Sequence, residues 1–172
     1  TASLLKWKPP YIVVDPVMVS KSGHHLLQPA AKNVLINELL PISTVVTPNL
    51  PEAEVILGRK ISSVEDMESA AIDIFQLGPK SVLVKGGHLS GDAVDVFYNG
   101  KSITRLSSVR IEKNNTHGTG CTLSSAIASY LAGGEELGSA IKKAKLYVTQ
   151  AIEHGLEIGK GVGPLNHFYK FY

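Results

Sequence analysis

The feature that most constrains the fold is an alternation of short β-branched runs with stretches of helical periodicity. Each buried-type run leads into a turn that carries proline or glycine, and strands are predicted at Tyr11–Val14, Ser43–Val46 and Ser81–Val84. Apolar residues at helical spacing predict helices over Pro29–Leu40, Glu52–Leu57, Ser62–Leu77, Leu123–Leu131 and Leu137–Ile152. The third helix has the clearest start, because Ser62 and Glu65 stand at capping-box spacing. Strands that alternate with helices indicate an α/β protein with a largely parallel sheet.

One pair of segments predicts an antiparallel addition to this sheet. Ala93–Tyr98 and Ser102–Leu106 flank Asn99-Gly100, the dipeptide most typical of a short β-hairpin. An antiparallel hairpin edge should therefore join the parallel strands. The sequence shows no internal repeat, no low-complexity stretch and no domain boundary, so a single domain is predicted over residues 1–172.

The charge and cysteine content exclude several kinds of partner. With 17 basic and 15 acidic side chains the net charge is +2, which is too balanced to suggest nucleic acid or a membrane surface. No apolar run approaches the length of a membrane span, and no signal peptide opens the sequence. The single cysteine excludes an internal disulfide and favours a reducing cytoplasm. We therefore expect a cytoplasmic protein.

The turn Gly118-Thr119-Gly120-Cys121 precedes the helix Leu123–Leu131. Its glycines let backbone N–H groups converge on one point, and the positive end of the helix dipole adds to them. Such a site suits a phosphate group. A helix N-terminus also favours a thiolate, so Cys121 could act as a base or as a nucleophile. An ordinary glycine turn with a small cysteine explains the pattern equally well.

The segment Thr47-Pro48-Asn49-Leu50-Pro51-Glu52 follows the second predicted strand, at the end where open α/β sheets bind ligands. An amide and a carboxylate three residues apart could hold hydrated Mg²⁺, which prefers oxygen ligands. The alternative is a turn in which Asn49 caps the next helix and Glu52 lies in its first turn. Taken alone, the pattern favours this capping interpretation.

Polar residues follow the other two predicted strands as well. Asp15 could lie beside a metal, with Val17 and Met18 lining a pocket, although a turn aspartate is the simpler explanation. Lys85 could reach nucleotide phosphates as a point charge, or could be a solvated lysine before a glycine turn. The pair His24-His25 lacks a third ligand at zinc spacing, which argues against a metal site there.

Together these segments resemble the hydroxymethylpyrimidine/phosphomethylpyrimidine kinases of the ribokinase superfamily. The resemblance covers the chain from about Tyr11 to Tyr172, and the segments that carry it are Val13–Gly23, Thr47–Glu54, Val84–His88, Asn115–Ala126 and Gly161–His167. The glycine-cysteine motif is the most specific, because sugar kinases of the superfamily have aspartate in place of the cysteine. The resemblance implies a ribokinase-like fold with three α/β/α layers, a mostly parallel sheet and an antiparallel hairpin edge.

The resemblance also implies a role for each candidate residue. Gly118, Thr119 and Gly120 would form an anion hole for the transferring phosphoryl group, and Cys121 would be the general base. The residues that would bind the nucleotide are Thr47, Asn49 and Lys85. Those that would organise Mg²⁺ are Asp15 and Glu52, and those that would line the substrate pocket are Val17 and Met18.

The implied function is ATP- and Mg²⁺-dependent phosphorylation of 4-amino-5-hydroxymethyl-2-methylpyrimidine and its monophosphate in thiamine biosynthesis, by a homodimer. A pyridoxal/pyridoxine kinase is the nearest alternative, since some members with this cysteine motif accept that ring. Members of the family begin with a glycine-rich strand segment and a glutamine that this chain lacks. The domain is therefore predicted to be incomplete at its N-terminus, and a non-catalytic nucleotide-binding remnant is an alternative of another class.

Overall fold

A computed structural model of the protein describes residues 1–18, 26–87, 93–111, 118–156, 158 and 161–171. The chain forms two compact units, residues 1–108 and residues 109–172. All strands of the described residues belong to the first unit, and the two longest helices belong to the second. The single domain and the incomplete N-terminus expected from the sequence stay predictions.

The first unit is built on a mixed sheet. In the described residues its strand order is β1-β2-β3-β4-β5, with bounds Val13–Val14, Val45–Val46, Val82–Val84, Ala93–Tyr98 and Ile103–Ser108. Strands β1, β2 and β3 pair in parallel, whereas β3, β4 and β5 pair antiparallel. The predicted α/β class and hairpin edge are thus confirmed, although β1 and β2 are shorter than predicted.

The hairpin turn shows why its sequence predicts it well. Gly100 has a φ of +85°, a conformation that favours glycine. The side chain of Asn99 accepts hydrogen bonds from the backbone N–H groups of Lys101 and Ser102, at 2.9 and 2.8 Å. The turn therefore supplies its own hydrogen bonds before β5 begins.

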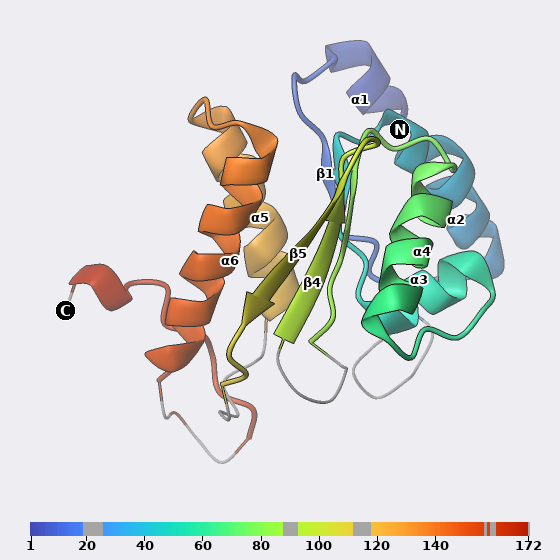
Figure 1. Ribbon diagram of the computed structural model, residues 1–172. Helices are drawn as coiled ribbons and strands as arrows, with labels where there is room; N and C mark the ends of the chain where they lie inside the picture. The colour runs from blue at the N-terminus through green and yellow to red at the C-terminus, as the bar shows by residue number, and fades with distance from the viewer. Residues whose placement is uncertain (19–25, 88–92, 112–117, 157, 159–160, 172) are drawn as a thin grey trace. The chain divides into compact units, whose positions relative to one another are not determined.

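Helices cover one face of this sheet (Figure 1). They are α2 (Pro29–Val34, continued by a π-turn and a 3₁₀ turn to Ile42), α3 (Leu50–Leu57) and α4 (Val64–Phe75), while a short α1 (Ala2–Trp7) opens the chain. A second helical layer would involve both units and stays a prediction.

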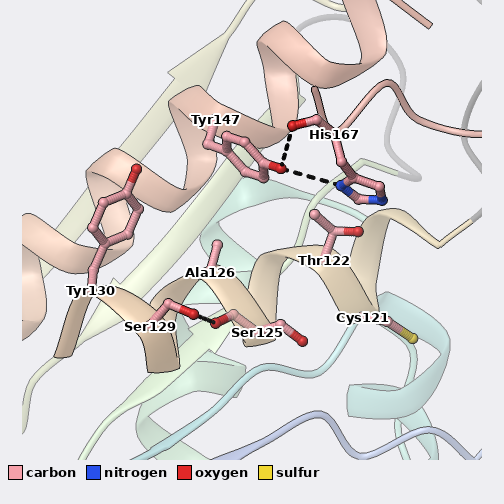
Figure 2. A pocket seen from close by; sticks show the side chains of 8 residues that line it. All are labelled: Cys121, Thr122, Ser125, Ala126, Ser129, Tyr130, Tyr147 and His167. Carbon is pink, nitrogen blue, oxygen red and sulfur yellow. Dashed lines mark hydrogen bonds between the residues drawn. The ribbon is translucent and has the colours of Figure 1, made fainter. Parts of the chain in front are cut away.

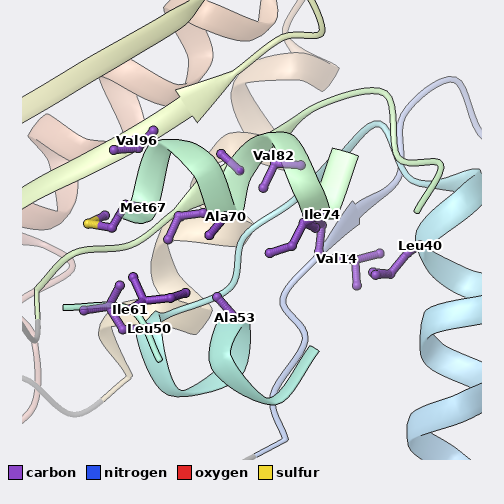
Figure 3. Packing of buried hydrophobic residues seen from close by; sticks show 13 residues of the cluster. Val14, Leu40, Leu50, Ala53, Ile61, Met67, Ala70, Ile74, Val82 and Val96 are labelled. Atoms are coloured by element: carbon purple, nitrogen blue, oxygen red, sulfur yellow. The ribbon is translucent and has the colours of Figure 1, made fainter. Parts of the chain in front are cut away.

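The core of the first unit lies between the sheet and these helices (Figure 3). Strand valines such as Val46 and Val82 pack with Ile74 and with the small residues Ala53 and Ala70, all fully buried. Small residues at these helix positions let the helices approach the sheet closely. Burial of each valine or isoleucine side chain contributes about 1.5–3 kcal/mol. The hydrophobic contacts fix the plane of the sheet, and therefore the positions of the strand ends.

The start of α4 differs from the prediction by one residue. The capping box joins Ser63 to Asp66, and the expected pair of Ser62 with Glu65 is wrong. Ser63 Oγ accepts the Asp66 N–H at 3.0 Å, and Asp66 Oδ2 accepts the N–H groups of both serines. A single carboxylate thereby satisfies two successive backbone donors, which Glu65 would not do from its position.

The second unit consists of α5 (Thr119–Ala132), α6 (Leu137–Glu153) and a C-terminal 3₁₀ turn (Tyr169–Phe171), and α5 packs against α6. The C-terminal tail lies on α6, where the ring of Tyr169 stacks on His154 and its hydroxyl donates to Gln150 Oε1 at 2.6 Å. Neither helix, nor any other in the described part of the chain, is long and apolar enough to cross a membrane.

Candidate active site

Each parallel strand of the first unit is followed at once by a polar residue. Asp15 follows β1, Thr47 follows β2 and Lys85 follows β3. Because the carboxyl ends of parallel strands lie along one edge of a sheet, the three side chains share that edge. We call these residues, with Asn49 and Glu52, the strand-end cluster.

An ion pair links the first and third strand ends. Lys85 Nζ lies 2.8 Å from Asp15 Oδ1, and only 14% and 13% of the two side chains are exposed. The hydroxyl of Thr47, which is fully buried, lies 3.4 Å from the same carboxylate oxygen. Neither Asp15 nor Lys85 is therefore the solvated turn residue that its local sequence allowed.

Asn49 and Glu52 form a reciprocal capping box at the start of α3. Asn49 Oδ1 accepts the Glu52 N–H at 2.9 Å, and Glu52 Oε2 accepts the Asn49 N–H at 2.8 Å. The capping interpretation is confirmed. A further role in binding Mg²⁺ is compatible with it, since each carboxylate oxygen has a second lone pair.

Glu52 is 2% exposed, and its burial raises the pKa of the carboxyl group above the ordinary value of 4.5. The N–H of Asn49, the charge of Lys85 and the N–H of Met18 lower the pKa, whereas the charge of Asp15 raises it. Glu52 is thus electrostatically coupled to both members of the ion pair. A bound cation would favour its ionised form in the same way as Lys85 does.

The two residues predicted to line a substrate pocket differ in exposure. Met18 is 2% exposed, and its backbone N–H is one of the groups that stabilise the Glu52 carboxylate. Val17 is 43% exposed and lies two residues after Asp15 in the chain. The pair His24-His25 lies outside the described residues.

The Gly118–Cys121 turn stands at the start of α5, where the sequence placed it. Gly118 is the N-cap residue with a φ of 80°, and it has no side chain with which to cap the helix. Cys121 is exposed in the first turn. This geometry agrees with an anion site, and the catalytic roles of Gly118, Thr119, Gly120 and Cys121 stay predictions.

A cavity of about 490 Å³ runs along α5 from this turn (Figure 2). Its lining is rich in hydroxyl groups and consists of Cys121, Thr122, Ser125, Ala126, Ser129, Tyr130, Tyr147 and His167. The hydroxyl of Tyr147 lies 3.2 Å from His167 Nδ1 and 3.2 Å from the His167 carbonyl oxygen, while Cys121 points away from both residues. Burial raises the pKa of Tyr147. Sequence reasoning missed this wall of the cavity, because Tyr147 reads as an ordinary position of an amphipathic helix.

The structure therefore brings together the five residues of the strand-end cluster within the first unit. The Gly118–Cys121 turn and its cavity belong to the second unit.

The donor set fits magnesium only as part of a nucleotide complex. Among the described residues, no three His, Cys, Asp or Glu side chains form a group that could hold a metal alone. Asp15 and Glu52 provide two carboxylates. Mg²⁺ commonly binds proteins through one or two carboxylates, with water and substrate phosphates as its other ligands.

An α/β sheet with a lysine and two carboxylates near its strand ends and a glycine turn at a helix start are features of phosphate-binding α/β proteins. A family model described as phosphomethylpyrimidine kinase matches residues 1–166. The chain belongs to this family.

Individual relatives agree with this assignment. The hydroxymethylpyrimidine/phosphomethylpyrimidine kinase of Rhizobium meliloti is 51% identical over 164 residues, which are 93% of this chain and 62% of the relative. A crystal structure of the Clostridium difficile phosphomethylpyrimidine kinase has a TM-score of 0.76 at 50% identity and covers 88% of this chain and 61% of that one. An ADP complex of Bacillus subtilis pyridoxal kinase has a TM-score of 0.88 at 36% identity and covers 97% and 62%.

These likenesses confirm the ribokinase-like fold expected from the sequence. The chain spans less than two thirds of the length of each of these relatives.

Proposed function

We propose that this chain belongs to an ATP-dependent kinase that phosphorylates 4-amino-5-hydroxymethyl-2-methylpyrimidine and its monophosphate in thiamine biosynthesis. The observation that carries the proposal is the gathering of Asp15, Thr47 and Lys85 at the ends of three adjacent parallel strands. Phosphoryl transfer asks a protein mainly to position its reactants and to stabilise charge. An edge that combines a cation with carboxylates suits the metal complex of a triphosphate.

The strand-end cluster would bind the nucleotide. Lys85 would pair with phosphate oxygens as a point charge, and Thr47 and Asn49 would offer a hydroxyl and an amide beside it. Magnesium, held by Asp15 and Glu52 together with phosphate oxygens, would supply positive charge against the triphosphate. The Bacillus subtilis relative was solved with ADP, which supports a nucleotide as the ligand of this fold.

The Gly118–Cys121 turn would serve the transfer itself. The backbone N–H groups of Gly118, Thr119 and Gly120 would stabilise the negative charge of the transferring phosphoryl group. The oxygen of the substrate hydroxymethyl group, or a phosphate oxygen when the substrate is the monophosphate, would form a bond to the γ-phosphorus as the bond between that phosphorus and the β,γ-bridging oxygen breaks. Cys121 would take the proton of the hydroxyl group as a general base. Val17 and Met18 would line the pocket for the pyrimidine ring.

A pyridoxal kinase is the second candidate, because the Bacillus subtilis pyridoxal kinase superposes with a TM-score of 0.88. The protein would act as a homodimer, which light scattering of the purified protein would test. It would lie in the cytoplasm, which fractionation of cells would test.

In the deciding experiment, the full natural chain is incubated with Mg-ATP and one of four substrates: the hydroxymethylpyrimidine, its monophosphate, pyridoxal or pyridoxine. The products are identified by mass spectrometry. We expect phosphorylation of the pyrimidine and of its monophosphate. Phosphorylation of the pyridine ring alone would establish the second candidate. Binding of ADP without any transfer would establish a nucleotide-binding remnant.

A further inference from the structure

Asp95 is a buried carboxylate that the proposed mechanism does not use. It lies inside β4, between two valines, and is 7% exposed. Within the described residues, Asp95 and Glu52 are the two acidic side chains that are buried. A buried carboxylate is costly unless it is hydrogen-bonded, so its partners indicate what it does.

One partner of Asp95 is the backbone where β3 leaves the sheet. Asp95 Oδ1 accepts the N–H of Gly86 at 2.9 Å, in a buried position. The last pair of the β3–β4 ladder is Val84 with Val96, so a regular ladder would continue with Lys85 opposite Asp95 and then Gly86 opposite Val94. The Asp95 side chain binds the Gly86 N–H at the point where this ladder ends.

Only glycine fits at this point of the chain. A Cβ atom on Gly86 would come within 1.9 Å of the Val94 carbonyl oxygen and 2.8 Å of Met67 Cε. The backbone after β3 therefore passes very close to β4, and the 2.9 Å hydrogen bond from the Gly86 N–H to Asp95 joins the two strands at this approach. At Gly87, one residue later, a Cβ would meet nothing within 4 Å.

The hydrogen bond to Gly86 also fixes Lys85. The N–H of Lys85 donates to the Pro48 carbonyl oxygen at 2.8 Å, on the β2 side, where Lys85 forms an isolated parallel bridge with Asn49. The next N–H, that of Gly86, is held by Asp95 on the β4 side. Two consecutive amides are thus fixed from opposite sides, and the Lys85 side chain leaves the backbone between them to reach Asp15.

We propose that Asp95 is a positioning residue for Lys85: through the Gly86 amide its carboxylate holds the end of β3, so that the ammonium group is presented at the strand ends to a nucleotide phosphate. This inference deepens the proposed function and rests on it. A purely structural carboxylate would stabilise the hairpin without affecting the nucleotide.

The test compares Asp95→Ala, Asp95→Asn and Val96→Ala in the full natural chain. Asp95→Ala removes the acceptor. Asp95→Asn keeps an oxygen that can accept the Gly86 N–H. Val96→Ala removes buried side-chain volume from the next position of the same strand, where Val96 is fully buried. Urea unfolding would show whether the two alanine variants lose similar amounts of stability. Steady-state kinetics would give kcat and the KM for ATP, and titration calorimetry would give the Kd for ADP.

We expect Asp95→Ala to raise the KM for ATP and the Kd for ADP about tenfold, as the misplacement of one hydrogen-bonding group allows. Asp95→Asn should restore both constants to near the wild-type values, and Val96→Ala should leave them unchanged. In a Lys85→Gln background, Asp95→Ala should have no further effect on the Kd for ADP, because its effect runs through the lysine.

Hydrogen exchange of the Gly86 amide supplies a readout that needs no activity. The amide should be protected in the wild type and in Asp95→Asn, and should exchange freely in Asp95→Ala. If Asp95→Ala loses stability and protection but keeps the wild-type Kd for ADP, Asp95 is structural and the inference is wrong. If the wild type binds no nucleotide at all, the proposed function is wrong, and this inference falls with it.

Discussion

The strand-end cluster and the Gly118–Cys121 turn are built in opposite ways. In the cluster the polar groups bind one another: Lys85 pairs with Asp15, and Asn49 and Glu52 cap each other's amides. At the turn, Gly118 offers no capping side chain and Cys121 is exposed. Function and stability should therefore be coupled in the cluster and separable at the turn.

The largest effect is expected from Cys121→Ala. A general base contributes about 10²–10⁴-fold to a rate, so phosphoryl transfer should fall by about that factor. Because the side chain is exposed, the free energy of unfolding should change by less than about 0.5 kcal/mol. Product formation, ADP binding and urea unfolding provide the three readouts. Turnover near the wild-type rate would remove Cys121 as the base, and a large loss of stability would contradict the comparison.

In Lys85→Met, unlike Cys121→Ala, function and stability should change together. The substitution leaves the partly buried carboxylate of Asp15 without its cationic partner, and the cost should stay below the roughly 3–5 kcal/mol of breaking a fully buried pair. The variant should lose stability and ADP affinity together. Lys80→Met, an identical substitution at an exposed lysine, serves as the control and should change neither. A Lys85→Met protein as stable as the wild type would show that the ion pair contributes little, and the cluster would then resemble the turn.

The pairing of Lys85 with Asp15 also marks the limit of sequence reasoning. Each residue is readable as a polar residue at a strand end, and the hairpin around Asn99-Gly100 and the start of α5 follow from local residue types. The two charges, however, stand 70 positions apart in the sequence. Their contact depends on the order of the strands in the sheet, which no local pattern contains.

Two further features escaped sequence reasoning for physical reasons of their own. Asp95 in the run Ala93–Tyr98 is visible as a lone charge among apolar residues, but its bond to Gly86 depends on the register of β3 against β4. The cap of α4 lies one residue after the predicted position, because Ser62 and Ser63 are equally good caps by residue type. The side chain of Asp66 decided between them by accepting both backbone amides.

Gly86→Ala tests how closely the end of β3 is held. A Cβ placed 1.9 Å from the Val94 carbonyl oxygen forces the end of β3 away from β4. Overpacking of this kind costs about 1–3 kcal/mol. The displacement should also weaken ADP binding, because Lys85 precedes the glycine. Gly87→Ala is the matched control, since its added methyl group meets nothing within 4 Å. Equal stability and equal ADP affinity in the two variants would show that β3 tolerates movement at its end.

Asn49→Ala removes one half of the capping box of α3. The loss of a side-chain cap costs about 1 kcal/mol of stability. If Asn49 also binds the nucleotide, the Kd for ADP should rise as well. Ser63→Ala removes the equivalent cap of α4, a helix that contributes no residue to the strand-end cluster, and should lower stability by a similar amount without changing the Kd. A change in the Kd for both variants would trace the effect to loss of stability alone.

The smallest effect is a dependence of stability on pH that separates two glutamates of the same helix. Burial raises the pKa of Glu52, so the folded protein favours the protonated form, and stability is lost as the pH rises from 4.5 through the raised value. Glu54 has a lowered pKa, chiefly because its carboxylate accepts the N–H of Ile61, so its contribution is present above 4.5 and is lost as the pH falls through the lowered value. In metal-free buffer, Glu52→Gln should therefore gain stability over the wild type between about pH 4 and about pH 7.5, whereas Glu54→Gln should lose it over the same range. Urea unfolding at both pH values measures the two slopes. If stability depended on pH with the same sign in both variants, burial would not raise the pKa of Glu52. The strand-end cluster would then be more open to solvent than its hydrogen bonds indicate.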